Sequence, residues 1–224
     1  MDWWVNNLLS TGGPSLVLAW TMWVVLSITL HELAHGWAAI RCGDRTPIET
    51  GHMTWNPVVH MGLPSLVLFA LCGLAYGTMP VDPSRFRRWW HDAAVSIAGP
   101  LMNLAIAAFA VAVAGLAVRF GAQSGGQGAK VAMQLVQFMW WGAVLNLLLA
   151  MFNLVPVPPL DGWRVLGTFV PGYRRAFESE GGMLLGLVML GVLFFYGGRT
   201  LVPIVVPAVE HAIMFIGGAP ASAP

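Results

Sequence analysis

Charged residues are scarce in this chain of 224 residues: 9% are charged, 57% are hydrophobic, and the mean hydropathy is +0.71. Soluble domains are roughly one quarter charged, so this composition excludes an ordinary soluble protein. Eleven Lys and Arg residues stand against ten Asp and Glu residues, which leaves a net charge of +1. Because the chain lacks a strongly basic balance, we expect no nucleic-acid partner. The two cysteines, Cys42 and Cys72, match neither a disulfide nor a metal-ligand spacing.

Long polar stretches are also missing, because the longest are about twenty residues, too short for an independent soluble module. We therefore predict a single membrane-embedded domain over residues 1–224, an all-α polytopic membrane protein with about five to six hydrophobic segments. Glycines and prolines interrupt the last segment, which forms either two short helices or one span with a broken return. The apolar windows are residues 14–40, 61–81, 93–118, 131–155 and 183–216.

The window 61–81 is dense in glycine and proline, which disfavours a regular helix. If the window crosses the membrane, the basic residues divide almost evenly between the two sides. If it enters and returns, eight arginines collect on one side, and Arg119 and Lys130 lie on the other. The excess of positive charge then favours a re-entrant window, with the basic side cytoplasmic, in a multi-pass protein of the plasma membrane. The eight arginines are Arg41, Arg45, Arg85, Arg87, Arg88, Arg164, Arg174 and Arg175.

The segment His31-Glu-Leu-Ala-His35 lies within the first window. Histidines four residues apart share one face of a helix and can reach one metal ion, a spacing that suits zinc. Glu32 is placed to take a proton from a water that the metal activates. The alternative is a pair of histidines that only pack between helices. Ionisable groups inside a bilayer are costly unless a metal or water compensates them, which weighs against that alternative.

Two histidines leave a metal short of protein ligands, and Asp161 is our candidate for the third. It ends the segment Asn153-Leu-Val-Pro-Val-Pro-Pro-Leu-Asp161, whose prolines prevent a regular helix and force an extended or kinked path. The alternative is an aspartate that caps the amphipathic stretch 163–178. If the window 61–81 is re-entrant, Asp161 lies on the same side of the membrane as the two histidines. If the window crosses fully, Asp161 lies on the opposite side.

These residues, together with Ala98-Gly-Pro-Leu-Met-Asn103, resemble the three linked motifs of the site-2 protease family of intramembrane zinc metallopeptidases. The motif-bearing core spans about residues 14–165, and the chain resembles compact members without PDZ or CBS modules. The resemblance implies one zinc ion per chain, held by His31, His35 and Asp161, with Glu32 as the catalytic general base. It also implies cleavage of a peptide bond in or next to a transmembrane segment of a membrane-protein substrate.

Two further expectations concern the substrate. The developing oxyanion needs a second donor, for which Asn153 is our candidate and Asn103 and Asn146 are less favoured, although all three could instead bond between helices. Residues 46–56 alternate enough to predict a short β-strand pair after the first span, whose edge would receive an unwound substrate.

Two other functions stand beside a protease. A metal transporter would use the histidine pair and Asp161 as a transit site, and an inactive relative would act as a membrane scaffold. Transport predicts polar residues along several spans, whereas here they concentrate near one end. The sequence does not indicate an oligomeric state.

Overall fold

The computed structural model describes residues 3–121 and 125–218, and every regular element in them is helical. Four helices are long and apolar enough to cross a membrane, namely α1, α4, α5 and α8, and α3 is a shorter apolar helix. The elements in chain order are α1 (Trp4–Cys42), α2 (Thr46–Glu49), α3 (Pro57–Cys72), the 3-10 helix η1 (Pro83–Arg85), α4 (His91–Gly121), α5 (Gly126–Asn153), α6 (Asp161–Phe169), α7 (Pro171–Glu178) and α8 (Glu180–Gly217).

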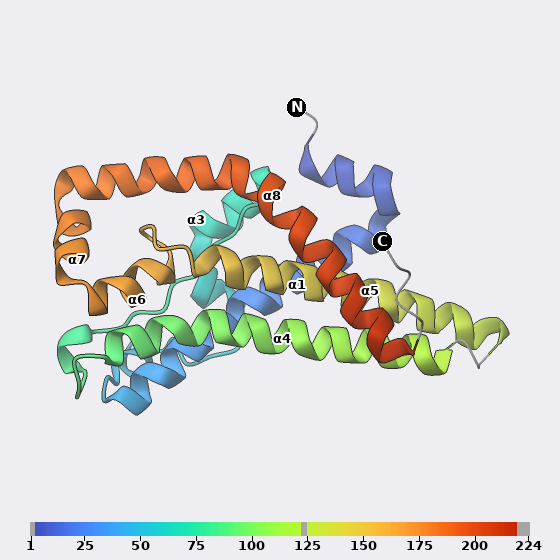
Figure 1. Cartoon of the computed structure of the whole chain (residues 1–224), viewed down its shortest axis with the longest axis horizontal. Helices are drawn as coiled ribbons and strands as arrows, with labels where there is room; N and C mark the ends of the chain where they lie inside the picture. The colour runs from blue at the N-terminus through green and yellow to red at the C-terminus, as the bar shows by residue number, and fades with distance from the viewer. Residues whose placement is uncertain (1–2, 122–124, 219–224) are drawn as a thin grey trace.

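Helix α4 is the centre of the fold, since it contacts α1, α5, α6 and α8. In Figure 1, α4 and α5 run side by side, with α6 and α7 at one end of the bundle and the last turns of α4 and first turns of α5 at the other. Fully buried alanines, Ala110 and Ala114 on α4 and Ala143 on α5, lie in the main core. Small side chains let helix backbones approach closely, which is a common basis of packing between membrane helices.

The predicted β-strand pair at residues 46–56 is wrong, because Thr46–Glu49 forms α2 and no residue in the described ranges is a strand. The Asp44 carboxylate accepts hydrogen bonds from the backbone N–H and the hydroxyl of Thr46, at 2.9 and 2.5 Å. Pro47 sits in the first turn of α2, where its fixed φ favours a helix. Gly51 then turns the chain with a φ of 72°. These local bonds outcompete the weak alternation that suggested strands.

The window 61–81 folds back on itself. Helix α3 bends at Gly62, whose φ of 64° is one that glycine adopts readily, and it ends at Cys72. The following residues return beside the helix, with the N–H of Thr78 donating to the carbonyl of His60 at 2.9 Å. The hydroxyl of Ser65 donates to the carbonyl of Tyr76 at 2.6 Å and accepts from its N–H at 2.9 Å. An extended segment, residues 74–82, is thereby fixed against α3.

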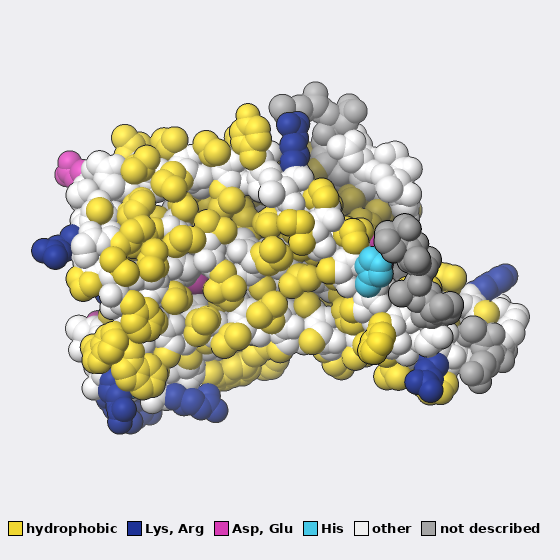
Figure 2. All heavy atoms as spheres, viewed as in Figure 1, with side chains coloured by type: hydrophobic (Ala, Val, Ile, Leu, Met, Phe, Trp, Pro, Cys, Tyr) yellow, Lys and Arg dark blue, Asp and Glu magenta, His cyan; other side chains and the backbone are white. Residues whose placement is uncertain are grey.

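The last apolar window forms one helix, α8, rather than two, with Pro203 and Pro207 inside it. Figure 1 shows that α8 changes direction along its length, first crossing the top of the bundle and then descending over α5 and α4. Hydrophobic side chains cover the middle of the face in Figure 2, whereas Lys and Arg lie mostly toward the ends. This distribution matches a bundle that exposes its middle to lipid.

Candidate metal centre

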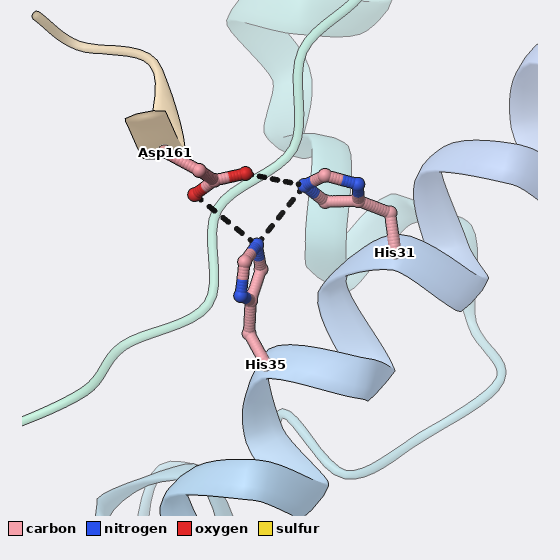
Figure 3. A group of neighbouring side chains, drawn as sticks. All are labelled: His31, His35 and Asp161. Carbon is pink, nitrogen blue, oxygen red and sulfur yellow. Dashed lines mark hydrogen bonds and ion pairs between the residues drawn. The ribbon is translucent and has the colours of Figure 1, made fainter. Parts of the chain in front are cut away.

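His31 and His35 lie one turn apart on α1, and both imidazoles point toward Asp161 at the start of α6 (Figure 3). The two Nε2 atoms are 3.0 Å apart. One carboxylate oxygen of Asp161 lies 3.1 Å from Nε2 of His31, and the other lies 3.4 Å from Nε2 of His35. Within the described part of the chain, this is the one group of three His, Cys, Asp or Glu side chains placed to hold a metal.

The outer nitrogens of both imidazoles face hydrogen-bond acceptors. Nδ1 of His31 lies 2.6 Å from the amide oxygen of Asn103, and Nδ1 of His35 lies 2.7 Å from the carbonyl of Val95. Each Nδ1 therefore carries a proton, and in a neutral imidazole the Nε2 atom is left with a lone pair. Metal-binding histidines are held in this way in proteins.

A cation fits the space between these three side chains. Two Nε2 lone pairs and a carboxylate meet there, and all are acceptors when the imidazoles are neutral. The Oδ2 atom of Asp161 is buried and has no hydrogen-bond partner. Nε2 of His31 lies 3.1 Å away, but it presents a lone pair to this oxygen and not a proton. Acceptors that converge in a buried space repel one another unless a positive charge joins them. Two histidines and one carboxylate form a three-ligand set found at catalytic zinc.

Asp161 reaches the histidines because the chain turns sharply after α5. That helix ends at Asn153, a run of turns follows, and α6 begins at Asp161 itself. Gly162 is helical, so its role is to provide room: an added Cβ would lie 2.3 Å from the carbonyl oxygen of Leu154. The prolines keep the connection out of a regular helix, as the sequence predicted.

Gly99 on α4 borders the same space. A Cβ built on it would lie 2.4 Å from Nε2 of His35 and 2.5 Å from Nε2 of His31. Any side chain there would stand where the two Nε2 atoms face Asp161. The motif Ala98-Gly-Pro-Leu-Met-Asn103 thus contributes space at Gly99 and an acceptor at Asn103. Sequence reasoning had singled out this motif without giving Gly99 a role.

Glu32 is buried beside the extended segment 74–82. A Cβ added to Gly77 would lie 2.5 Å from Oε1 of Glu32, so the backbone of that segment passes directly over the carboxylate. The returning chain therefore lies next to the candidate general base.

The asparagines fall into two groups. The amide of Asn153 donates to the carbonyl of Leu149 on its own helix at 3.0 Å, so it faces its own backbone rather than the histidines or Asp161. Asn103 and Asn146 are fully buried and bond to each other at 2.8 Å, across α4 and α5. Bonding between helices is the alternative that the sequence left open for these two residues.

The other four histidines lie outside the metal group. His60 is fully buried, and its Nε2 bonds the carbonyl of Thr54 at 2.7 Å. Each of the remaining three has Nδ1 within hydrogen-bond distance of a backbone carbonyl. These are His52, His91 and His211.

A cluster of charges that sequence reasoning did not identify holds α6 in place. Asp92, buried at the start of α4, contacts Arg174 of α7 at 3.0 Å and Arg164 of α6 at 3.8 Å. A hydrogen bond from Arg174 to Glu178 raises the pKa of the Arg174 guanidinium, which stays charged. Asp92 is buried and would be left without a positive partner if α6 and α7 moved away, so these contacts resist displacement of the helix that carries Asp161. The arginines had been read only as markers of membrane side.

Together, four apolar helices around two histidines and an aspartate define a membrane-embedded metalloprotein. The model of peptidase family M50 matches residues 19–196, and the chain therefore belongs to that family, the site-2 proteases. It is a multi-pass membrane protein and an intramembrane zinc metalloprotease, and its cofactor is zinc. Family membership decides against the transporter, and the intact His31, Glu32, His35 and Asp161 weigh against an inactive scaffold.

Three relatives illustrate the family, and all are named as zinc metalloproteases. YwhC of Bacillus subtilis is 33% identical over 183 residues, which cover 81% of this chain and 80% of YwhC. Rip2 of Mycobacterium tuberculosis is 32% identical over 188 residues, 77% of this chain and 64% of Rip2. Rip3 of the same species is 28% identical over 201 residues, 85% of this chain and 41% of Rip3. No solved structure shows significant similarity to the chain.

Replacing Gly99 with alanine tests whether α4 borders the metal space. The new methyl group would stand within 2.5 Å of both Nε2 atoms, so we expect zinc affinity to fall by on the order of tenfold or more. Competition with a chelator on detergent-purified protein measures this. Gly172→Ala on α7 is the matched control, because a Cβ there meets nothing within 4 Å. Unchanged affinity in Gly99→Ala would place the metal elsewhere.

Proposed function

We propose that His31, His35 and Asp161 hold the zinc ion and that Glu32 acts as the general base in peptide hydrolysis. The observation that carries this proposal is the convergence of three buried acceptor atoms from α1 and α6. Two histidines and a carboxylate are a combination of ligands found at catalytic zinc, which supports the proposal. The substrate is a membrane protein, cut in or next to a transmembrane segment, because the ligands from α1 lie inside a candidate span.

The residues of the chain divide the chemistry among them. A bound zinc ion supplies Lewis acidity toward water and toward the scissile carbonyl. Glu32 takes a proton from the attacking water and later gives it to the leaving amine. Its carboxylate is buried under the backbone at Gly77, which keeps bulk water from competing for the proton. The segment 74–82 passes next to Glu32 at Gly77.

We also propose Asn153 as the donor to the developing oxyanion. It ends α5, at the point where the chain turns toward Asp161. Its amide donates to the carbonyl of Leu149 in this structure. To donate to a substrate oxygen, the side chain must rotate away from that carbonyl. The proposal is supported by its place in the proline-bent segment, since oxyanion donors must stand next to the reacting carbonyl.

We further propose that residues 1–224 form one metalloprotease domain in the plasma membrane, with the active site toward the cytoplasm. Helix α8 contacts α4, α5 and α7, which supports one folding unit that includes the C-terminal segment 183–216. Arg164, Arg174 and Arg175 lie on α6 and α7 at one end of the bundle, and Lys130 lies near the other. An excess of arginine marks the cytoplasmic side in membrane proteins.

Replacing Glu32 with glutamine should abolish proteolysis and leave zinc bound. An amide of the same shape cannot accept the proton, and loss of a general base lowers rates by about 10²–10⁴-fold. The measurement is cleavage of a tagged single-span reporter protein reconstituted with the enzyme in liposomes, beside zinc analysis of the same sample. Glu180→Gln, at an exposed acid that opens α8, should cleave normally. Full cleavage by Glu32→Gln would remove Glu32 from the reaction.

Replacing Asp161 with alanine should remove the third ligand. We expect the metal content of the purified protein to fall from about one zinc per chain toward zero after mild dialysis, because two histidines alone hold zinc weakly. Elemental analysis gives the content directly. Glu180→Ala, at an exposed acid that opens α8, should keep its zinc. Undiminished zinc in Asp161→Ala would assign the third ligand to another residue.

Cysteine labelling in intact cells tests the membrane side. In a Cys72→Ala background, Gly172→Cys on α7 should resist a membrane-impermeant maleimide, and Lys130→Cys on α5 should react with it. Both positions are exposed, and Cys42 is buried, so the added cysteine reports alone. The reverse pattern would turn the protein over in the membrane and place α6 and α7 outside.

A further inference from the structure

A chain of buried amides connects His31 to the backbone of α5. The amide oxygen of Asn103 lies 2.6 Å from Nδ1 of His31, and the amide nitrogen of Asn103 donates to Asn146 at 2.8 Å. The amide nitrogen of Asn146 donates to the hydroxyl of Ser27 at 2.8 Å and to the carbonyl of Gly142 at 2.9 Å. We call these side chains and the Gly142 carbonyl the amide relay.

The relay is sealed from solvent and joins three helices. Ser27 lies on α1, Asn103 on α4 and Asn146 on α5, and each of the three side chains is 0% exposed. A buried polar group without a partner destabilises the fold, because it loses its hydrogen bonds to water and gains none. Each amide is therefore held in the orientation that satisfies its neighbours.

The direction of the relay is set at its far end. The carbonyl of Gly142 can only accept, so the nitrogen of Asn146, and not its oxygen, must face it. The oxygen of Asn146 then faces Asn103, which must present its own nitrogen. That turns the oxygen of Asn103 toward His31, where it accepts a proton from Nδ1. A backbone carbonyl on α5 thus decides which nitrogen of an imidazole on α1 carries the hydrogen.

We infer that Asn103 is a positioning residue for zinc, which, through the amide relay, holds His31 with its proton on Nδ1 and its Nε2 lone pair directed at the metal space. This inference rests on the proposed role of His31 as a ligand. Hydrogen bonds to the outer nitrogen of a ligand histidine fix its tautomer and ring orientation. Asn146 acts one step further away, by keeping the amide of Asn103 from turning over.

The second histidine is held differently. Nδ1 of His35 donates to the carbonyl of Val95, a backbone group of α4 that cannot turn over. Its orientation needs only α1 and α4, whereas that of His31 needs α1, α4 and α5 packed together. Removal of the relay should therefore disable one ligand and leave the other in place.

Zinc affinity of purified variants tests the inference. Asn103→Leu removes the acceptor with little change in size, and we expect it to bind zinc 10–100-fold more weakly than wild type in competition with a chelator. Asn103→Asp keeps an oxygen for Nδ1 but sets an acceptor against the oxygen of Asn146, so it should recover only part of that loss. Asn146→Leu should weaken binding by less than Asn103→Leu, because the acceptor remains but is free to turn.

Thr29→Val is the matched control. It removes a buried hydroxyl from α1, two residues before His31, that bonds only to its own helix at Val25. This variant should bind zinc as wild type does. Equal losses of zinc affinity in Thr29→Val and Asn103→Leu would mean that the affinity follows the stability of the fold. Wild-type affinity in Asn103→Leu would mean that Asn103 does not position the zinc site. Either result overturns this inference and leaves the proposed function standing. A wild-type protein that binds no zinc overturns the proposed function as well.

A measurement on the unmodified chain covers the case in which Asn103→Leu does not fold. Zinc-loaded wild-type protein with isotope-labelled histidine should show His31 protonated at Nδ1 by NMR, with its signals assigned by their loss in His31→Gln. Protonation at Nε2 instead would contradict the direction of the relay and overturn the inference.

Discussion

Three hydrogen-bond acceptors, the Nε2 atoms of His31 and His35 and the carboxylate of Asp161, meet in a buried space of this bundle. Such a meeting is repulsive in the absence of positive charge, and burial makes the repulsion stronger because little water screens it. Helix α1 places the two histidines on one side of this space, and the turn after α5 places Asp161 on the other. Zinc is the cofactor of the family to which the chain belongs. Metal binding and assembly of the bundle are therefore coupled.

Helix α4 serves this arrangement along one face. Asp92 holds α6 and α7 by ion pairs, the carbonyl of Val95 contacts His35, Gly99 leaves room beside the two imidazoles, and Asn103 contacts His31. These positions follow one another at three- and four-residue steps, the spacing of a single helical face. One helix thus sets the positions of both histidines and of the aspartate, although it supplies no ligand itself.

The sequence misled where local and tertiary effects compete. Residues 46–56 alternate weakly like strands, but hydrogen bonds to the Asp44 carboxylate and the position of Pro47 make a short helix instead. The sequence does not predict that Asn103 and Asn146 belong to one chain of hydrogen bonds. That chain depends on which residues of α1, α4 and α5 lie at the same height in the bundle. Only the fold brings Arg164 and Arg174 to Asp92, since these residues lie far apart in the chain.

The sequence by itself determined the membrane class, the helical architecture, the chemistry and the identity of the candidate ligands. These properties follow from composition and from short spacings. One helix turn brings His31 and His35 together, and the prolines before Asp161 prevent a regular helix there. Only the tertiary structure decided the path of residues 74–82 over Glu32, the room left at Gly99 and the direction of the amide relay. These depend on contacts between segments far apart in the chain, and no local pattern of residues encodes such contacts.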